Sequence, residues 1–175
     1  DDDLFIDFIN SEALKDIKFI IAPHTIKFTQ IKSFQEKLKT KTILYSQKDK
    51  HAVSSAQVFI IDTIGLLSKI YSYADIAYVG GAMGHTGLHN TLEPAVFGVP
   101  IIIGNNHSKF PEAKAMIDNL GMFAVSNQQE FKSTINLLIT DEQKRISSGN
   151  NNLEYINKNK GAVKHILKYL NLSVG

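Results

Sequence analysis

A group of glycines and polar side chains lies between two short apolar runs, residues 76–79 and 101–103. The glycines are Gly80, Gly81, Gly84 and Gly87. Asn90 and Glu93 follow them, near the start of a helix predicted over 88–97. Glycine lets a ligand come close to the backbone, and the free N–H groups at a helix start favour phosphate. The expected ligand is therefore a nucleotide or a sugar phosphate.

Asn90 and Glu93 have two interpretations. In the first, Asn90 is the N-cap of the helix and Glu93 completes a pair that resembles a capping box. In the second, the Glu93 carboxylate accepts hydrogen bonds from the hydroxyls of a ribose. The two interpretations are compatible for Asn90 and compete for Glu93.

Other ligand-binding patterns are weaker. His85, His89 and Glu93 recur every four residues, as metal ligands on one face of a helix would. Gly84 and Gly87 disfavour a helix at His85, so no metal site is expected. The chain has neither a Gly-x-Gly-x-x-Gly fingerprint nor a P-loop.

Hydrophobic periodicity predicts that strands and helices alternate along the chain. Strands are expected at 18–23, 42–45, 58–61, 76–79, 99–103 and 122–125. Helices are expected at 2–13, 26–39, 65–73, 88–97, 109–119, 128–139, 141–157 and 161–170, with a loop or frayed helix at 48–55 and breaks at 150–152 and Gly161. This alternation is typical of an α/β fold, with a Rossmann-like parallel sheet and helices on both faces.

Ligands of such sheets bind beyond the carboxyl ends of the strands. The glycines, the pair Pro23–His24 and Asp62 each follow a predicted strand, so we expect them at one edge. Taken alone, His24 is more typical of a structural hydrogen-bonding residue than of a catalyst. Asp62 also fits a simple cap on the following helix.

The composition of the chain indicates its class and makes several kinds of function unexpected. The length of 175 residues and the hydrophobic fraction of 43% suit a single globular domain over 1–175. The net charge is +2 and Arg145 is the only arginine, so nucleic-acid recognition through arginine is not expected. The chain has no cysteine, and neither a membrane span nor a basic leader is expected.

Several motifs are more specific in combination than alone. Three lie between residues 79 and 101: Val79-Gly80-Gly81, Gly87-x-His89-Asn90-x-x-Glu93-Pro94-Ala95 and Phe97-Gly98-x-Pro100-Ile101. The others are Ala22-Pro23-His24, Asp62-Thr63-x-Gly65-x-Leu67, Phe110-x-Glu112-Ala113 and Asn159-x-Gly161-Ala162. Together they resemble the C-terminal half of the bacterial 3-deoxy-D-manno-octulosonic acid (Kdo) transferases, and the resemblance covers most of the chain.

The resemblance implies a glycosyltransferase of the GT-B type, built from two Rossmann-like halves. Residues 1–175 would form the half that binds the nucleotide sugar. The N-terminal acceptor domain would lie outside this chain, with its catalytic base, its membrane-associating segment and one strand of the present half. No catalytic residue is therefore expected in 1–175, and the chain alone should bind nucleotide weakly and catalyse nothing.

The implied reaction transfers Kdo from CMP-Kdo to a lipid A precursor in lipopolysaccharide core biosynthesis. The transfer would invert the configuration at the anomeric carbon and release CMP. It would take place at the cytoplasmic face of the bacterial inner membrane. No metal or other cofactor is expected, because this donor carries one phosphate.

The donor-binding residues implied by the resemblance are Pro23, His24, Lys27, Gly80, Gly81, Met83, Gly87, His89, Asn90 and Glu93. Glu93 would bind the ribose, and the backbone from Gly87 to Asn90 would face the phosphate. Met83 would lie beside the base, or else only pack within its loop. Many members of the family carry a Pro-Arg-His-Pro-x-Arg loop, whereas this chain has Pro-His-Thr-Ile-Lys at 23–27, where Lys27 would supply a point charge.

Three alternatives stay open at this point. The first is another GT-B glycosyltransferase, or an epimerase, that uses a UDP-sugar. The second is a nucleotide-binding or interaction domain without catalysis. The third is a metal-dependent hydrolase that uses His85, His89 and Glu93.

Overall fold

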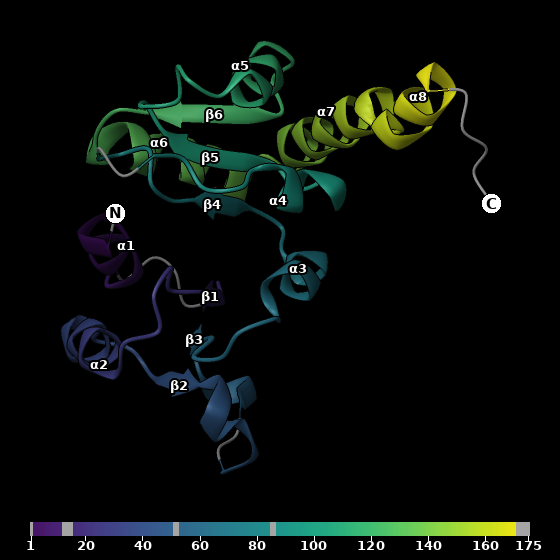
Figure 1. Ribbon diagram of the computed structural model, residues 1–175. Coiled ribbons are helices and arrows are strands. Elements are labelled where there is room, and N and C mark those ends of the chain that lie inside the picture. The colour runs from purple at the N-terminus through teal and green to yellow at the C-terminus, as the bar shows by residue number, and fades with distance from the viewer. Residues whose placement is uncertain (1, 12–15, 51–52, 85–86, 171–175) are drawn as a thin grey trace. The chain divides into compact units, whose positions relative to one another are not determined.

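The computed structural model describes residues 2–11, 16–50, 53–84 and 87–170 (Figure 1). The chain divides into two compact units, Asp1–Ile70 and Tyr71–Gly175, and each is considered by itself. Each unit contains a three-stranded parallel sheet. The predicted α/β fold with parallel strands is confirmed. That the 175 residues form a single domain stays a prediction.

The first unit has a sheet whose middle strand comes last in sequence. Its strands are β1 (Phe19–Ile21), β2 (Thr42–Leu44) and β3 (Val58–Ile60), in the order β1-β3-β2. Its helical elements are α1 (Asp2–Ile9), α2 (Phe28–Lys37), the 3₁₀ turns η2 (Tyr45–Lys50) and η3 (Val53–Ser55), and α3 (Leu67–Ile70). Val58 and Ile60 are buried, which suits β3 to the centre of the sheet.

The second unit has its strands in sequence order, β4-β5-β6, and Figure 1 shows them side by side. They are β4 (Ala77–Val79), β5 (Ile101–Gly104) and β6 (Met122–Val125). The helical elements are η4 (Tyr71–Tyr73), α4 (Leu92–Val96), α5 (Pro111–Asp118), α6 (Gln128–Thr140), α7 (Glu142–Asn159) and α8 (Ala162–Tyr169).

Helices cover both faces of this second sheet. Ile101, Ile102 and Ile103 of β5 have no exposed surface, although successive side chains of a strand point to opposite faces. On one face, the Tyr78 ring meets Phe131 of α6 edge-on, with 5.8 Å between the ring centroids. On the other face, Val79 shares a core cluster with Met116 of α5. The two-sided covering expected for a parallel sheet is therefore present.

The predicted helix limits are wrong in several places, including the end of α1, the start of α4 and the middle of α7. The helix expected over 88–97 begins only at Leu92, because the Asn90 side chain forms a local turn by accepting the Leu92 N–H at 3.1 Å. The break expected at 150–152 does not occur, and α7 runs unbroken through it. The break at Gly161 is confirmed, since it separates α7 from α8.

Asn152 explains why α7 continues. Its side chain is buried, and Nδ2 donates to the carbonyl oxygens of Val99 at 2.8 Å and Gly121 at 2.7 Å. An amide nitrogen carries two N–H donors, so both are used. These carbonyls lie just before β5 and β6, and Asn152 therefore ties α7 to the amino ends of both strands.

We predict that Asn152→Ala lowers the free energy of unfolding by about 2–4 kcal/mol, because two buried carbonyls each lose a donor. Asn150→Ala is the matched control: Asn150 is an exposed asparagine on the same helix, and its loss should change stability by less than about 0.5 kcal/mol. Urea unfolding of the two variants gives both values. Equal effects would contradict the role assigned to Asn152.

Candidate functional site

The glycine-rich segment after β4 closes on itself. The His89 N–H donates to the Gly80 carbonyl oxygen at 3.1 Å, which brings the two ends of the segment together. Gly81 has a φ of +97°, and a Cβ there would lie 1.9 Å from the Gly87 carbonyl oxygen. Side chains are thus excluded from position 81 both by backbone conformation and by space. This loop begins at the carboxyl end of β4, where ligands of parallel sheets bind.

The same loop lies directly on the end of β5. The Asn106 N–H donates to the Ala82 carbonyl oxygen at 2.9 Å, and Asn106 Nδ2 donates to the Gly84 carbonyl oxygen at 2.9 Å. A Cβ on Gly104 would lie 2.2 Å from the Met83 nitrogen. Asn106 was not among the residues predicted for the site, although its place just after the 101–103 run was a usable signal.

Asn90 and Glu93 form a pair, as predicted, but their side chains bind each other directly. Asn90 Nδ2 donates to Glu93 Oε1 at 3.0 Å, while Thr91 occupies the N-cap position. The Thr91 side chain makes no capping bond, whereas Asn90 Oδ1 accepts the Leu92 N–H at 3.1 Å, so Asn90 makes the predicted bond to the start of the helix from one residue before the N-cap position. Because Oε1 is the oxygen that Asn90 uses, the pair leaves the second carboxylate oxygen, Oε2, outside this bond.

Tyr71 interacts electrostatically with Glu93, and the sequence does not predict this interaction. It packs against the core cluster of the second unit. Burial raises the pKa of Tyr71 to about 12, and the Glu93 carboxylate adds to this rise. The phenol therefore stays protonated above the pH at which tyrosine ordinarily ionises, and its O–H remains a hydrogen-bond donor.

The structure brings together seven of the ten predicted donor-binding residues. They lie in one segment that runs from the end of β4 into the first turn of α4: Gly80, Gly81, Met83, Gly87, His89, Asn90 and Glu93. Met83 and His89 are half-buried there.

The remaining three belong to the first unit and follow β1: Pro23, His24 and Lys27. His24 and Lys27 are exposed, and Lys27 is the N-cap residue of α2. The carboxyl ends of the strands therefore carry predicted residues in both units.

Asp62 has a structural role in the first unit. Its carboxylate accepts the Ser46 N–H at 2.9 Å and the Ser46 hydroxyl at 2.5 Å. These bonds fasten the turn after β2 to the end of β3. The interpretation of Asp62 as a helix cap is therefore replaced by this cross-strand contact.

The described ranges contain no group of three or more His, Asp or Glu side chains arranged to hold a metal ion. The metal-triad alternative also depends on His85, which lies outside the described residues. Within the same ranges, no helix combines the length and apolar character needed to cross a membrane.

No family model matches the chain, but several curated proteins are similar to it in sequence. The 3-deoxy-D-manno-octulosonic acid transferase of Haemophilus influenzae is 28% identical over 86% of this chain and 36% of its own length. The enzyme of the same name from Aquifex aeolicus is 29% identical over 71% of this chain and 34% of its own length.

A solved structure agrees with these relatives. The C-terminal CMP-Kdo binding domain of WaaA from Acinetobacter baumannii superimposes with a TM-score of 0.75, at 20% identity, over 88% of this chain and 80% of that one. The chain is a relative of the Kdo transferases. Its fold is that of their C-terminal domain, and the chain spans about a third of the length of the curated relatives, 36% and 34% in the two cases above.

The arginines that many Kdo transferases carry after the second strand have no counterpart in this relative. Its one arginine, Arg145, is engaged elsewhere: Nη1 donates to the carbonyl oxygens of Leu138 at 2.9 Å and Ile139 at 3.2 Å. Arg145 thus caps the carboxyl end of α6. It is bound to the fold, so the other cationic side chains that these 175 residues can offer a phosphate are lysines and histidines.

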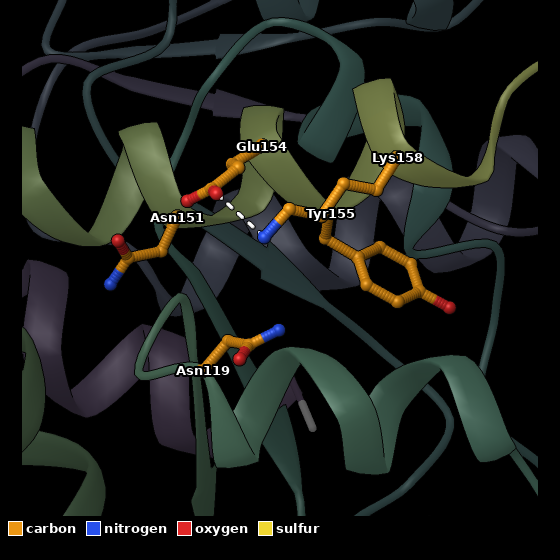
Figure 2. A pocket seen from close by; sticks show the side chains of 5 residues that line it. All are labelled: Asn119, Asn151, Glu154, Tyr155 and Lys158. Atoms are coloured by element: carbon orange, nitrogen blue, oxygen red, sulfur yellow. Dashed lines mark ion pairs between the residues drawn. The ribbon is translucent and has the colours of Figure 1, made fainter.

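A small polar depression lies elsewhere on this Kdo transferase relative (Figure 2). Its volume is about 70 Å³, and Asn119, Asn151, Glu154, Tyr155 and Lys158 line it. Asn119 follows α5 and precedes β6, which places the depression at the amino edge of the sheet, opposite the glycine loop. Ligand pockets usually enclose about 300–1,000 Å³, so this depression is too small for a nucleotide.

We predict that Gly81→Ala distorts the loop and lowers the free energy of unfolding by more than about 2 kcal/mol, because alanine is strained at this φ and its Cβ meets backbone. Gly84→Ala is the control in the same loop, since a Cβ at Gly84 meets nothing within 4 Å. Thermal unfolding of the two variants tests this. A Gly81→Ala variant as stable as Gly84→Ala would show that the loop has another conformation.

Proposed function

We propose that this chain is the donor-binding half of a Kdo transferase and that it binds CMP-Kdo at the glycine loop of its second unit. The observation that carries the proposal is the closed loop at the carboxyl end of β4, which leads directly to the Glu93 carboxylate. The relatives named Kdo transferase support the reaction class, and the WaaA domain supports the donor.

Glu93 is proposed to bind the ribose of the donor. An ionised carboxylate accepts short, strong hydrogen bonds from hydroxyl groups. Asn90 engages Oε1 at 3.0 Å, so Oε2 is the oxygen assigned to the ribose hydroxyls. The structural and the binding interpretations of Glu93 are then compatible, with one oxygen for each.

The backbone of the glycine loop in the second unit is proposed to meet the phosphate. Gly80, Gly81 and the backbone from Gly87 to Asn90 admit the nucleotide close to the main chain. Negative charge develops on the phosphate as CMP leaves, and backbone N–H groups directed at the phosphate stabilise such charge. Because α4 has only five residues, its dipole adds little, and the loop N–H groups carry this role.

The acceptor and the cellular setting complete the proposal. The parent enzyme transfers Kdo to a lipid A precursor in lipopolysaccharide biosynthesis, at the cytoplasmic face of the bacterial inner membrane. The acceptor, the catalytic base and the membrane contact are assigned to the part of the relatives that this chain does not match. The UDP-sugar alternative is less favoured, because the relatives named above are Kdo transferases.

We expect CMP to bind the 175-residue chain in a calorimetric titration, with weaker binding of UMP and UDP. Glu93→Ala should weaken CMP binding by about 1–3 kcal/mol, the cost of leaving hydrogen-bonding groups of the nucleotide unmatched. Glu142→Ala, which removes an exposed glutamate from the start of α7, is the control. Unchanged CMP affinity in a folded Glu93→Ala variant would exclude the ribose role, and preference for UDP would favour the UDP-sugar alternative.

We also expect no Kdo transfer from CMP-Kdo to a lipid A precursor by this chain alone, because the proposed catalytic base is not part of it. Product formation is measured with a radiolabelled acceptor, and a full-length Kdo transferase serves as the positive control. Transfer by the chain alone would place a catalytic group within these 175 residues.

A further inference from the structure

Asn106 fastens the glycine loop at two points, and we propose that it is a positioning residue for nucleotide binding. This inference rests on the proposed function. Its backbone N–H binds the Ala82 carbonyl and its side-chain amide binds the Gly84 carbonyl, both at 2.9 Å. One residue of the loop after β5 therefore holds the residues on either side of Met83.

The loop after β5 approaches this segment backbone to backbone. A Cβ on Gly104 would lie 2.2 Å from the Ala82 carbonyl carbon and from the Met83 nitrogen. Glycine at 104 allows the two backbones to come this close, but it has no side chain that could hydrogen-bond to the loop. Asn106 provides this hydrogen bond, because its side-chain amide N–H is a directional donor.

The side-chain contact of Asn106 lies outside the core. Asn106 and its side-chain partner Gly84 are both exposed, whereas Ala82, which only the Asn106 backbone binds, is a buried member of the core cluster of the second unit. Loss of an exposed hydrogen bond opens the segment it holds with little effect on global stability. Without this bond, the loop should populate several conformations, of which only one binds nucleotide. The apparent affinity then falls in proportion to the fraction of molecules in the binding conformation.

Methionine supplies the measurement. The chain has three methionines: Met116 and Met122 are buried in the core, and Met83 is half-buried in the loop. With 13C-methyl-labelled methionine, each gives its own NMR signal. In Asn106→Ala, the Met83 signal should shift or broaden while the signals of Met116 and Met122 stay in place.

Two further variants sharpen the comparison. Asn106→Asp keeps the shape of the side chain and the backbone bond to Ala82, but it puts a carboxylate where Gly84 needs a donor, so it should act at least as strongly as Asn106→Ala. Asn105→Ala is the matched control, since Asn105 is the exposed asparagine just before it. This control should leave all three methyl signals unchanged.

Calorimetric titration with CMP then tests the functional part. Asn106→Ala should weaken CMP binding by about threefold to tenfold, the loss expected for one hydrogen bond that organises the site. Movement of all three methyl signals, movement of none, or unchanged CMP affinity would each overturn the inference. If the unmodified chain binds no CMP, the proposed function fails, whereas the methyl signals still decide whether Asn106 positions Met83.

Discussion

The close backbone contact between the glycine loop and the end of β5 is the constraint on which the candidate site depends. It follows from the sheet register, in which Val79 pairs with Ile103. Because the two strands are parallel, the segments after them emerge side by side at the same edge. Gly104 leaves no room for a Cβ where these backbones meet, and Gly81 leaves none within the loop, where it faces Gly87. The loop is therefore placed by the sheet rather than by its own side chains.

The register is stabilised far from the site. The three isoleucines of β5 have no exposed surface, and a shift of one residue would move each of them to the opposite face. At the other end of the strand, Asn152 binds the carbonyls that precede β5 and β6. A single buried amide on α7 thus holds the amino ends of both strands, at the edge of the sheet away from the glycine loop.

The strands were predictable from the sequence because burial on both faces leaves continuous apolar runs. Helix ends were less predictable, since asparagine takes opposite roles in this chain. Asn90 binds the nearby Leu92 N–H and delays α4, whereas Asn152 binds distant carbonyls and leaves α7 unbroken. The local sequence does not distinguish the two cases, because the partners of Asn152 are distant in sequence and come close only on folding. Tyr71 was missed for the same reason, as its neighbour Glu93 is 22 positions further along the chain.

The competition between a structural and a binding role for Glu93 disappears once its geometry is considered. A carboxylate has two oxygens, and the bond from Asn90 occupies one of them. That bond also restricts the rotamers of the glutamate, and restricting them before binding reduces the entropy lost when a ligand is held. The neutral Tyr71 phenol adds no charge that would oppose the carboxylate. The structural bond therefore favours the proposed ribose role, because it orients the remaining oxygen before the nucleotide arrives.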